Sequence, residues 1–199
     1  MCWCAAGYRV GMDALDLLTA DHNRVRGLFA RFHEAQEKDD TATMQEVATK
    51  IFEELKVHTE IEEKIFYPAV HDLDAVAEVV DEGLEEHHVV DVLMEEAQKL
   101  DPSDPQWVAK VTVLIENVEH HAEEEETELF PKVRSETSAP TRQDWGQRME
   151  RHKAELGAPT SADAENLTTE ELKRLAAEQQ IPGRSTMSRE DLVATVDPR

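Results

Sequence analysis

The amino-acid sequence predicts an all-α protein built on an antiparallel four-helix bundle, and three observations lead to this fold class. The chain of 199 residues contains only 7 glycines and 8 prolines, and good helix formers dominate the rest. Apolar residues recur at helical spacing through four long segments, which are 13–37, 43–71, 73–100 and 105–134. The connections between these segments are short, so antiparallel neighbours are the simplest arrangement.

The first two predicted helices each carry an apolar face with one histidine at its centre. In the first, leucines, a valine and phenylalanines surround His22 at helical spacing, and the polar run at 39–41 ends the helix. In the second, isoleucines, a leucine and a phenylalanine share a face with His58. We therefore expect both histidines to point into the bundle.

The third and fourth predicted helices repeat this arrangement. His87 lies in phase with the apolar residues of the third helix, whereas the adjacent His88 is expected to point outward or sideways. The Asp-Pro-Ser-Asp-Pro run at 101–105 ends that helix, because proline cannot continue a helix and Ser or Asp favours a cap. In the fourth helix the same comparison selects His121 over His120 as the inward-facing residue.

The chain divides into four parts in this interpretation. Residues 1–11 form a disordered N-terminal tail, 12–135 form the bundle, and 136–166 form a linker with a short helix near 143–156. The remaining segment, 167–197, is predicted to be a small helix–loop–helix module with Ser/Thr caps at both helix starts.

Composition and charge limit the setting in which the protein works. The 44 acidic and 21 basic side chains give a formal net charge of −23, a field that repels nucleic acids and anionic membranes and concentrates cations. Both cysteines, Cys2 and Cys4, lie in the first four residues, so no disulfide is expected to link the core. The start lacks the pattern of a signal peptide and no segment approaches the roughly 20 apolar residues of a membrane span. We expect a cytoplasmic protein with no membrane partner.

A doubled motif indicates the chemistry. His58 and Glu62 are separated by four positions, which places them on one helix face, and His121 and Glu125 repeat the spacing. Each histidine precedes an aromatic–proline pair at the same distance. A single His-x-x-x-Glu in a charged helix would be weak evidence, but two copies with the same continuation form a much more specific signal.

The inward-facing histidines and the two glutamates predict a dinuclear metal site. Buried charged groups are costly unless they are paired or bind a metal. Imidazole and carboxylate ligands without thiolate suit iron, manganese or zinc, and the two carboxylates are expected to bridge the ions. The expected ligands are His22, His58, Glu62, His87, His121 and Glu125.

With these motifs, residues 12–135 resemble the hemerythrin-like HHE cation-binding domain. The resemblance implies an up-down-up-down four-helix bundle that holds two non-haem iron ions joined by oxo or hydroxo and carboxylate bridges. It also implies a role in dioxygen binding, in oxygen or redox sensing, or in iron handling.

The sequence departs from the oxygen-carrying hemerythrins at two places. Those proteins have a second histidine four residues after the third-helix histidine, where this chain has Asp91. They also use His-x-x-x-x-Asp, where this chain has Glu125 at the fourth position and Glu126 at the fifth. Asp91 is expected either to supply an extra ligand or to face solvent, and metal binding is better supported than reversible oxygen carriage.

The C-terminal segment resembles the small module at the start of Rho termination factors and in SAP-like domains. The resemblance implies that Ile181 and Met187 belong to its core and that the module contacts nucleic acid or another protein. Its four basic residues are few beside the overall charge for a DNA-binding surface. They are Lys173, Arg174, Arg184 and Arg189.

Three functions are compatible with these observations. The first is a metal-binding sensor or store that responds to oxygen, oxidants or iron. The second is a di-iron enzyme acting on peroxide or nitric oxide, which ranks lower because the sequence offers no general acid–base pair beside the metal. The third is an interaction protein without a redox role. A ferritin-like site is disfavoured because Glu85-x-x-His88 has no second copy.

Overall fold

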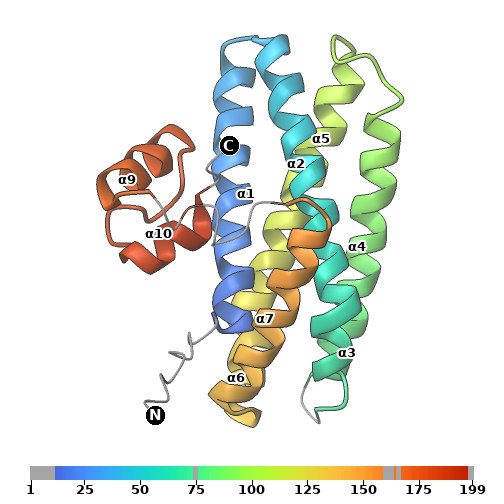
Figure 1. The fold of residues 1–199 in the computed structure, drawn as a ribbon. Helices are drawn as coiled ribbons and strands as arrows, with labels where there is room; N and C mark the ends of the chain where they lie inside the picture. Colours follow the sequence, from blue (N-terminus) through green and yellow to red (C-terminus); the bar gives the residue numbers. More distant parts are fainter. Residues whose placement is uncertain (1–11, 74–75, 159–163, 165–166, 197–199) are drawn as a thin grey trace.

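The computed structural model describes residues 12–73, 76–158, 164 and 167–196, and all regular structure in them is helical. Cys2, Cys4 and the predicted tail lie outside the described residues. Four long helices run up, down, up and down side by side (Figure 1). They are α1 (Ala14–Glu37), α2 (Thr41–Ile61), α4 (Ala77–Ala97) and α5 (Pro105–Glu124). The predicted four-helix bundle is confirmed.

Aspartate caps explain where three of these helices begin. Asp13 accepts a hydrogen bond from the backbone N–H of Leu15 at the start of α1, and Asp40 and Asp104 cap α2 and α5 in the same manner. Pro105 occupies the first turn of α5, where a missing N–H costs nothing. The polar runs at 39–41 and 101–105 therefore end one helix and also start the next.

Two widened turns interrupt the bundle at matching places. After α2, the π-helical turn η1 (Glu62–Phe66) leads into α3 (Tyr67–Val70), and after α5 the turn η2 (Glu125–Leu129) leads into α6 (Phe130–Glu136). A proline follows each turn, and its ring clashes with the carbonyl four residues earlier in a regular α-helix. The extra residue of a π-turn accommodates the proline, and such turns occur frequently at functional sites.

The interior consists of two apolar cores separated by a polar layer. One core lies near the α1–α2 and α4–α5 connections and includes Phe32, Ile51 and Leu114. The other lies near the opposite end of the bundle and includes Leu18 and Phe66. The level between them holds the predicted metal ligands, so the apolar cores enclose the site from both ends.

The segment expected to be largely a linker contains a helix that packs on the bundle. This helix, α7 (Ala139–Glu155), starts four residues earlier than the expected 143–156 because Ser138 caps it. Its Trp145 and Met149 join the second core. Gly146 lets α7 approach closely, since a side chain there would collide with the carbonyl oxygen of Met12.

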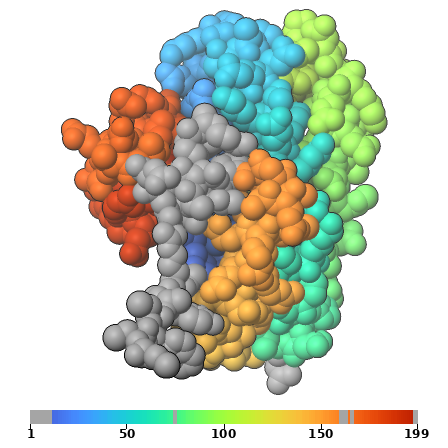
Figure 2. Space-filling view, in the orientation of Figure 1, coloured from blue at the N-terminus to red at the C-terminus, as the bar shows by residue number. Residues whose placement is uncertain are grey.

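The C-terminal module packs against α1 and forms a lobe beside the bundle (Figure 2). Capping boxes start both of its helices, α9 (Thr169–Glu178) and α10 (Arg189–Thr195). Its core is separate from those of the bundle and includes the fully buried Ile181, against which Met187 packs. Gly27 of α1 allows this contact, because a Cβ atom there would collide with the carbonyl oxygen of Gln179. Among the described residues, no helix is long and apolar enough to cross a bilayer.

Candidate metal centre

The structure brings all six predicted ligands together in the polar layer. Each is at least nine-tenths buried, and they come from four different helices or helix extensions. The group consists of His22 on α1, His58 on α2, Glu62 in η1, His87 on α4, His121 on α5 and Glu125 in η2. The side chains lie close enough to one another for shared coordination of metal ions.

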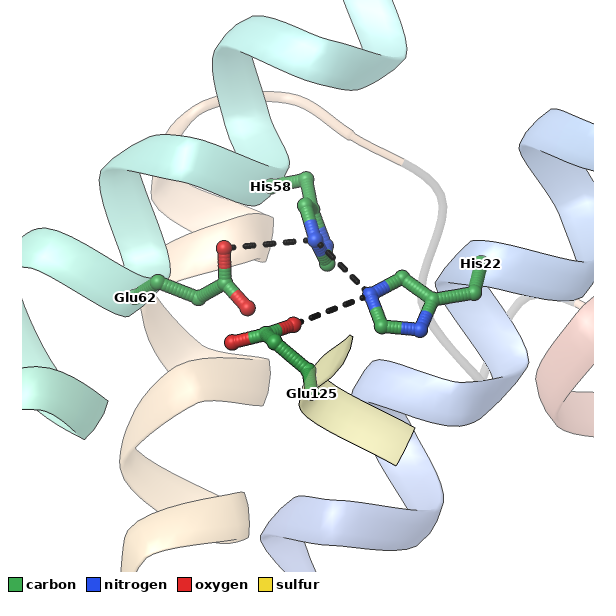
Figure 3. Close-up of side chains that lie close together, drawn as sticks. All are labelled: His22, His58, Glu62 and Glu125. Carbon is green, nitrogen blue, oxygen red and sulfur yellow. Dashed lines mark hydrogen bonds and ion pairs between the residues drawn. The ribbon is translucent and has the colours of Figure 1, made fainter. Parts of the chain in front are cut away.

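The histidines form two facing pairs. The Nε2 atoms of His22 and His58 are 3.2 Å apart, and those of His87 and His121 are 3.1 Å apart. Each pair joins two helices of one half of the bundle. Figure 3 shows the first pair together with the two glutamates, whose carboxylates point into the same space.

The two glutamates connect the halves. An oxygen of Glu62 lies 3.2 Å from Nε2 of His58 and 3.4 Å from Nε2 of His87. An oxygen of Glu125 lies 3.3 Å from Nε2 of His22 and 3.8 Å from Nε2 of His121. Each carboxylate therefore faces one histidine of each half, which is the arrangement that a pair of bridging ligands requires.

Several of these buried oxygen atoms make no hydrogen bond to the described residues. Both carboxylate oxygens of Glu62 and one of Glu125 are in this state. An uncompensated buried polar atom costs about 1 to 3 kcal/mol, and more when it is charged. A cation between the carboxylates and the imidazoles would remove this cost, so the donor set fits a metal centre.

Each of the four central histidines has an acidic residue on the side away from the centre. Nδ1 of His22 lies 2.8 Å from Glu126, and Nδ1 of His87 lies 3.0 Å from Glu63. Nδ1 of His121 lies 2.7 Å from Glu86, and Nδ1 of His58 lies 3.9 Å from Asp21. The first three of these contacts are hydrogen bonds, whereas Nδ1 of His58 makes none to the described residues. A carboxylate that accepts from Nδ1–H leaves the Nε2 lone pair free for a metal ion, as in many metalloproteins.

These four supporting carboxylates were not predicted, although the repeat in the sequence contains them. Asp21 and Glu86 directly precede the histidines of α1 and α4, and Glu63 and Glu126 directly follow Glu62 and Glu125. Each therefore has a counterpart at the same offset in the other half. Acidic residues recurring at equal offsets in both halves narrow the candidates, but Glu60 and Glu123 share this property and support no central histidine.

Burial and charge perturb the protonation of the site in opposite directions. Burial and the neighbouring Glu125 raise the pKa of Glu62 well above its usual value. Burial also opposes ionisation of Glu125, but the charges on His121 and His22 hold the pKa of this carboxyl well below its usual range. Burial lowers the pKa of His58 to about 4, against the opposing influence of Asp21. The pKa values of the two carboxyls are therefore shifted in opposite directions, and His58 is neutral. An ionised Glu125 and a neutral imidazole are both able to bind a metal cation.

One aromatic position breaks the symmetry of the centre. The Tyr67 hydroxyl donates to Glu125 over 3.0 Å and lies 3.4 Å from Nε2 of His121. The matching residue of the other half is Phe130, whose ring stacks on His22. Gly83 makes room for the hydroxyl, since a Cβ atom there would lie 3.0 Å from the Tyr67 oxygen. Among the described residues, the tyrosine hydroxyl therefore has no counterpart at the matching position of the other half.

The two residues whose direction was left open lie outside the centre. Asp91 is exposed on α4 and belongs to none of the metal-ligand clusters among the described residues. His88 is also exposed, as its offset from the apolar face indicated. Of the two expectations for Asp91, the solvent-facing one agrees with the structure.

Comparison with known proteins gives an independent indication of the family. The model of the hemerythrin HHE cation binding domain matches residues 13–133. A relative from Nostoc sp. named DNA nickase is 28% identical over 145 residues, which cover 73% of this chain and 40% of the relative. The chain thus spans less than half of that protein. No solved structure matches the chain.

Proposed function

The chain belongs to the hemerythrin family of HHE cation-binding domains, and from this premise we propose that it holds two iron ions and senses or stores oxidants or iron. The observation that carries the proposal is the pair of bridging carboxylates with unpartnered buried oxygens between four inward-facing imidazole nitrogens. Iron suits this donor set, with manganese and zinc as alternatives of similar ligand preference. When bound, two iron ions supply one-electron chemistry and reactivity toward dioxygen and other small oxidants.

The surroundings of the centre favour a small ligand. A cavity beside His22 and His58 has a volume of about 10 Å³ and is partly lined by Val25, Leu55 and Val118. This space is about that of one water molecule, so it suits a diatomic molecule or peroxide rather than a larger substrate.

Turnover of peroxide or nitric oxide is a second candidate, and the Tyr67 hydroxyl favours it. This group is buried beside Glu125, where burial and the nearby carboxylates raise its pKa well above the usual value. It therefore stays protonated and can donate a hydrogen bond at the edge of the centre. Catalytic loss of peroxide by the iron-loaded protein, absent in His58→Ala, would promote this function over sensing.

The C-terminal module is proposed to act in docking. The relative's printed name concerns DNA, but residues 167–196 of this chain carry four basic and five acidic side chains. A nucleic-acid surface needs a concentrated basic patch, which this composition does not supply. Contact with protein surfaces, including the bundle itself, fits this charge better.

Iron content with an optical spectrum tests the proposal. We expect about two irons per chain, near-ultraviolet bands that bleach on reduction, and a lower melting temperature after iron removal, because metal binds only the folded state. Glu62→Gln should lower the iron content below two per chain, while Glu85→Gln on the exposed face of α4 should not. A protein without iron, or with a single zinc ion, would contradict the proposed redox role.

A further inference from the structure

The two halves of the centre differ most where their supporting carboxylates meet the surface. In the first half, Asp21 is enclosed: Lys153 of α7 donates to both of its oxygens, and Arg24 lies 3.3 Å away. In the second half, no equivalent of α7 covers Glu86 among the described residues, and its side chain is 21% exposed. Of these two corresponding carboxylates, Asp21 is therefore covered by α7, whereas Glu86 reaches the surface beside α5.

Two further potential ligands stand beside Glu86. His120 and Glu124 are separated by one helical turn on α5, and Nε2 of His120 lies 3.6 Å from Glu124 and 4.0 Å from Glu86. One ligand atom from each of the three residues lies within 4.8 Å of the others. The first half has Val57 and Ile61 at the positions of His120 and Glu124, so this group is specific to the second half.

Glu86 connects this group to the buried centre. One of its oxygens lies 2.7 Å from Nδ1 of His121, and the other faces Nε2 of His120. An exposed His–Glu pair at one-turn spacing is common on acidic helices and means little by itself. Here a third residue, Glu86, comes from the neighbouring helix α4. The buried His121 already holds the Glu86 side chain in place, so less side-chain conformational entropy is lost when a cation binds.

We propose that Glu86, His120 and Glu124 form an outer, exchangeable site for a divalent metal cation. One imidazole and two carboxylates suit Zn²⁺, Fe²⁺ or Mn²⁺, and the exposure of His120 leaves coordination positions for water. The strongly acidic protein concentrates such cations at its surface. The second part of the proposal rests on the proposed function: this site delivers iron to the buried centre past Glu86, which contacts both His120 and His121.

Zinc titration tests the outer site by itself. With the buried centre filled with iron, we expect one additional Zn²⁺ per chain by equilibrium dialysis. His120→Ala should weaken this binding at least tenfold and Glu124→Gln should weaken it several-fold, whereas His88→Ala, an exposed histidine of α4, should leave it unchanged. Equal zinc affinity in the wild type and His120→Ala would overturn the outer site.

Iron loading tests delivery. When Fe²⁺ is added to the metal-free protein, His120→Ala should fill the centre several-fold more slowly than the wild type and His88→Ala, yet reach the same final iron content. Equal initial rates would overturn delivery and leave the outer site standing. The Glu62→Gln variant separates the two proposals, because it should lose iron at the centre while zinc binding still responds to His120→Ala. If the wild type takes up no iron, the proposed function fails, and zinc binding then decides the outer site alone.

Discussion

Tyr67 and Phe130 occupy equivalent positions in the two halves, yet they give the centre two different environments. The Tyr67 ring stacks on His87 and its hydroxyl reaches Glu125. Leu18 of α1 and Gly83 of α4 also correspond, and only the glycine leaves space for a hydroxyl. The tyrosine and the glycine therefore form one structural unit, in which each residue explains the other.

This coupling predicts a non-additive result for Gly83→Ala. In a helix, replacing glycine by alanine usually stabilises by about 1 kcal/mol. In the wild type the new methyl group would lie 3.0 Å from the Tyr67 oxygen, so we expect most of that gain to be lost. In Tyr67→Phe part of the gain should reappear, because the contact of 3.3 Å with Cε1 of His121 remains.

Denaturant unfolding of the four metal-free proteins measures the effect as a double-mutant cycle. The two single variants, the double variant and the wild type supply their own controls. Equal effects of Gly83→Ala in both backgrounds would contradict the coupling.

At the scale of the element, two features hold α7 on the bundle. Its apolar face is covered, and its buried charged residue, Lys153, is paired. Lys153 is 3% exposed and donates to both oxygens of Asp21. Burial opposes ionisation of Asp21, but Lys153 together with the nearby His58 and Arg24 holds its pKa far below the usual range. The contact also fixes the carboxylate that lies beside His58.

Loss of the lysine should therefore be costly. Breaking a buried ion pair by removing one partner costs roughly 3 to 5 kcal/mol, and because Arg24 still accompanies Asp21 we expect about 3 kcal/mol for Lys153→Met. Arg134→Met removes an exposed pair with Asp16 and should cost only about 0.5 kcal/mol. Urea unfolding compares the two variants, and similar small losses in both would show that α7 is not held by this pair.

At the scale of the whole molecule, one buried arginine joins the module to the bundle and to the centre. Arg24 donates to the backbone oxygens of Ala194 and Thr195, the last carbonyls of α10. The same guanidinium lies beside Asp21 and Glu54. The final carbonyls of a helix have no partner within the helix, so this side chain satisfies groups that would otherwise be left unpaired in the interface.

Arg24→Ala should release the module without unfolding the bundle. We expect limited proteolysis to cleave between the bundle and the module at least tenfold faster than in the wild type, leaving a protected bundle fragment. Arg148→Ala, which removes an exposed arginine of α7, should not change the rate. An unchanged cleavage pattern in Arg24→Ala would show that other contacts hold the module.

The sequence by itself determined the four long helices and the placement of the six central residues. Helical periodicity records which face of a helix is buried, so it selected His87 over His88 and His121 over His120 without knowledge of the packing. The repeated His-x-x-x-Glu with its following proline then related the two halves to each other. These signals lie within single helices, where spacing along the chain corresponds directly to position in space.

The tertiary structure alone decided which acidic side chains support the histidines, where α7 packs and how the module docks. Contacts such as Glu126 with His22 and Lys153 with Asp21 join residues more than 100 positions apart, and one carboxylate in a run of glutamates looks like the next. The π-turns add a further reason. Each contains one extra residue, so a helical period of 3.6 residues per turn no longer predicts which way the side chains point within these turns. The supporting carboxylates Glu63 and Glu126 lie in these turns.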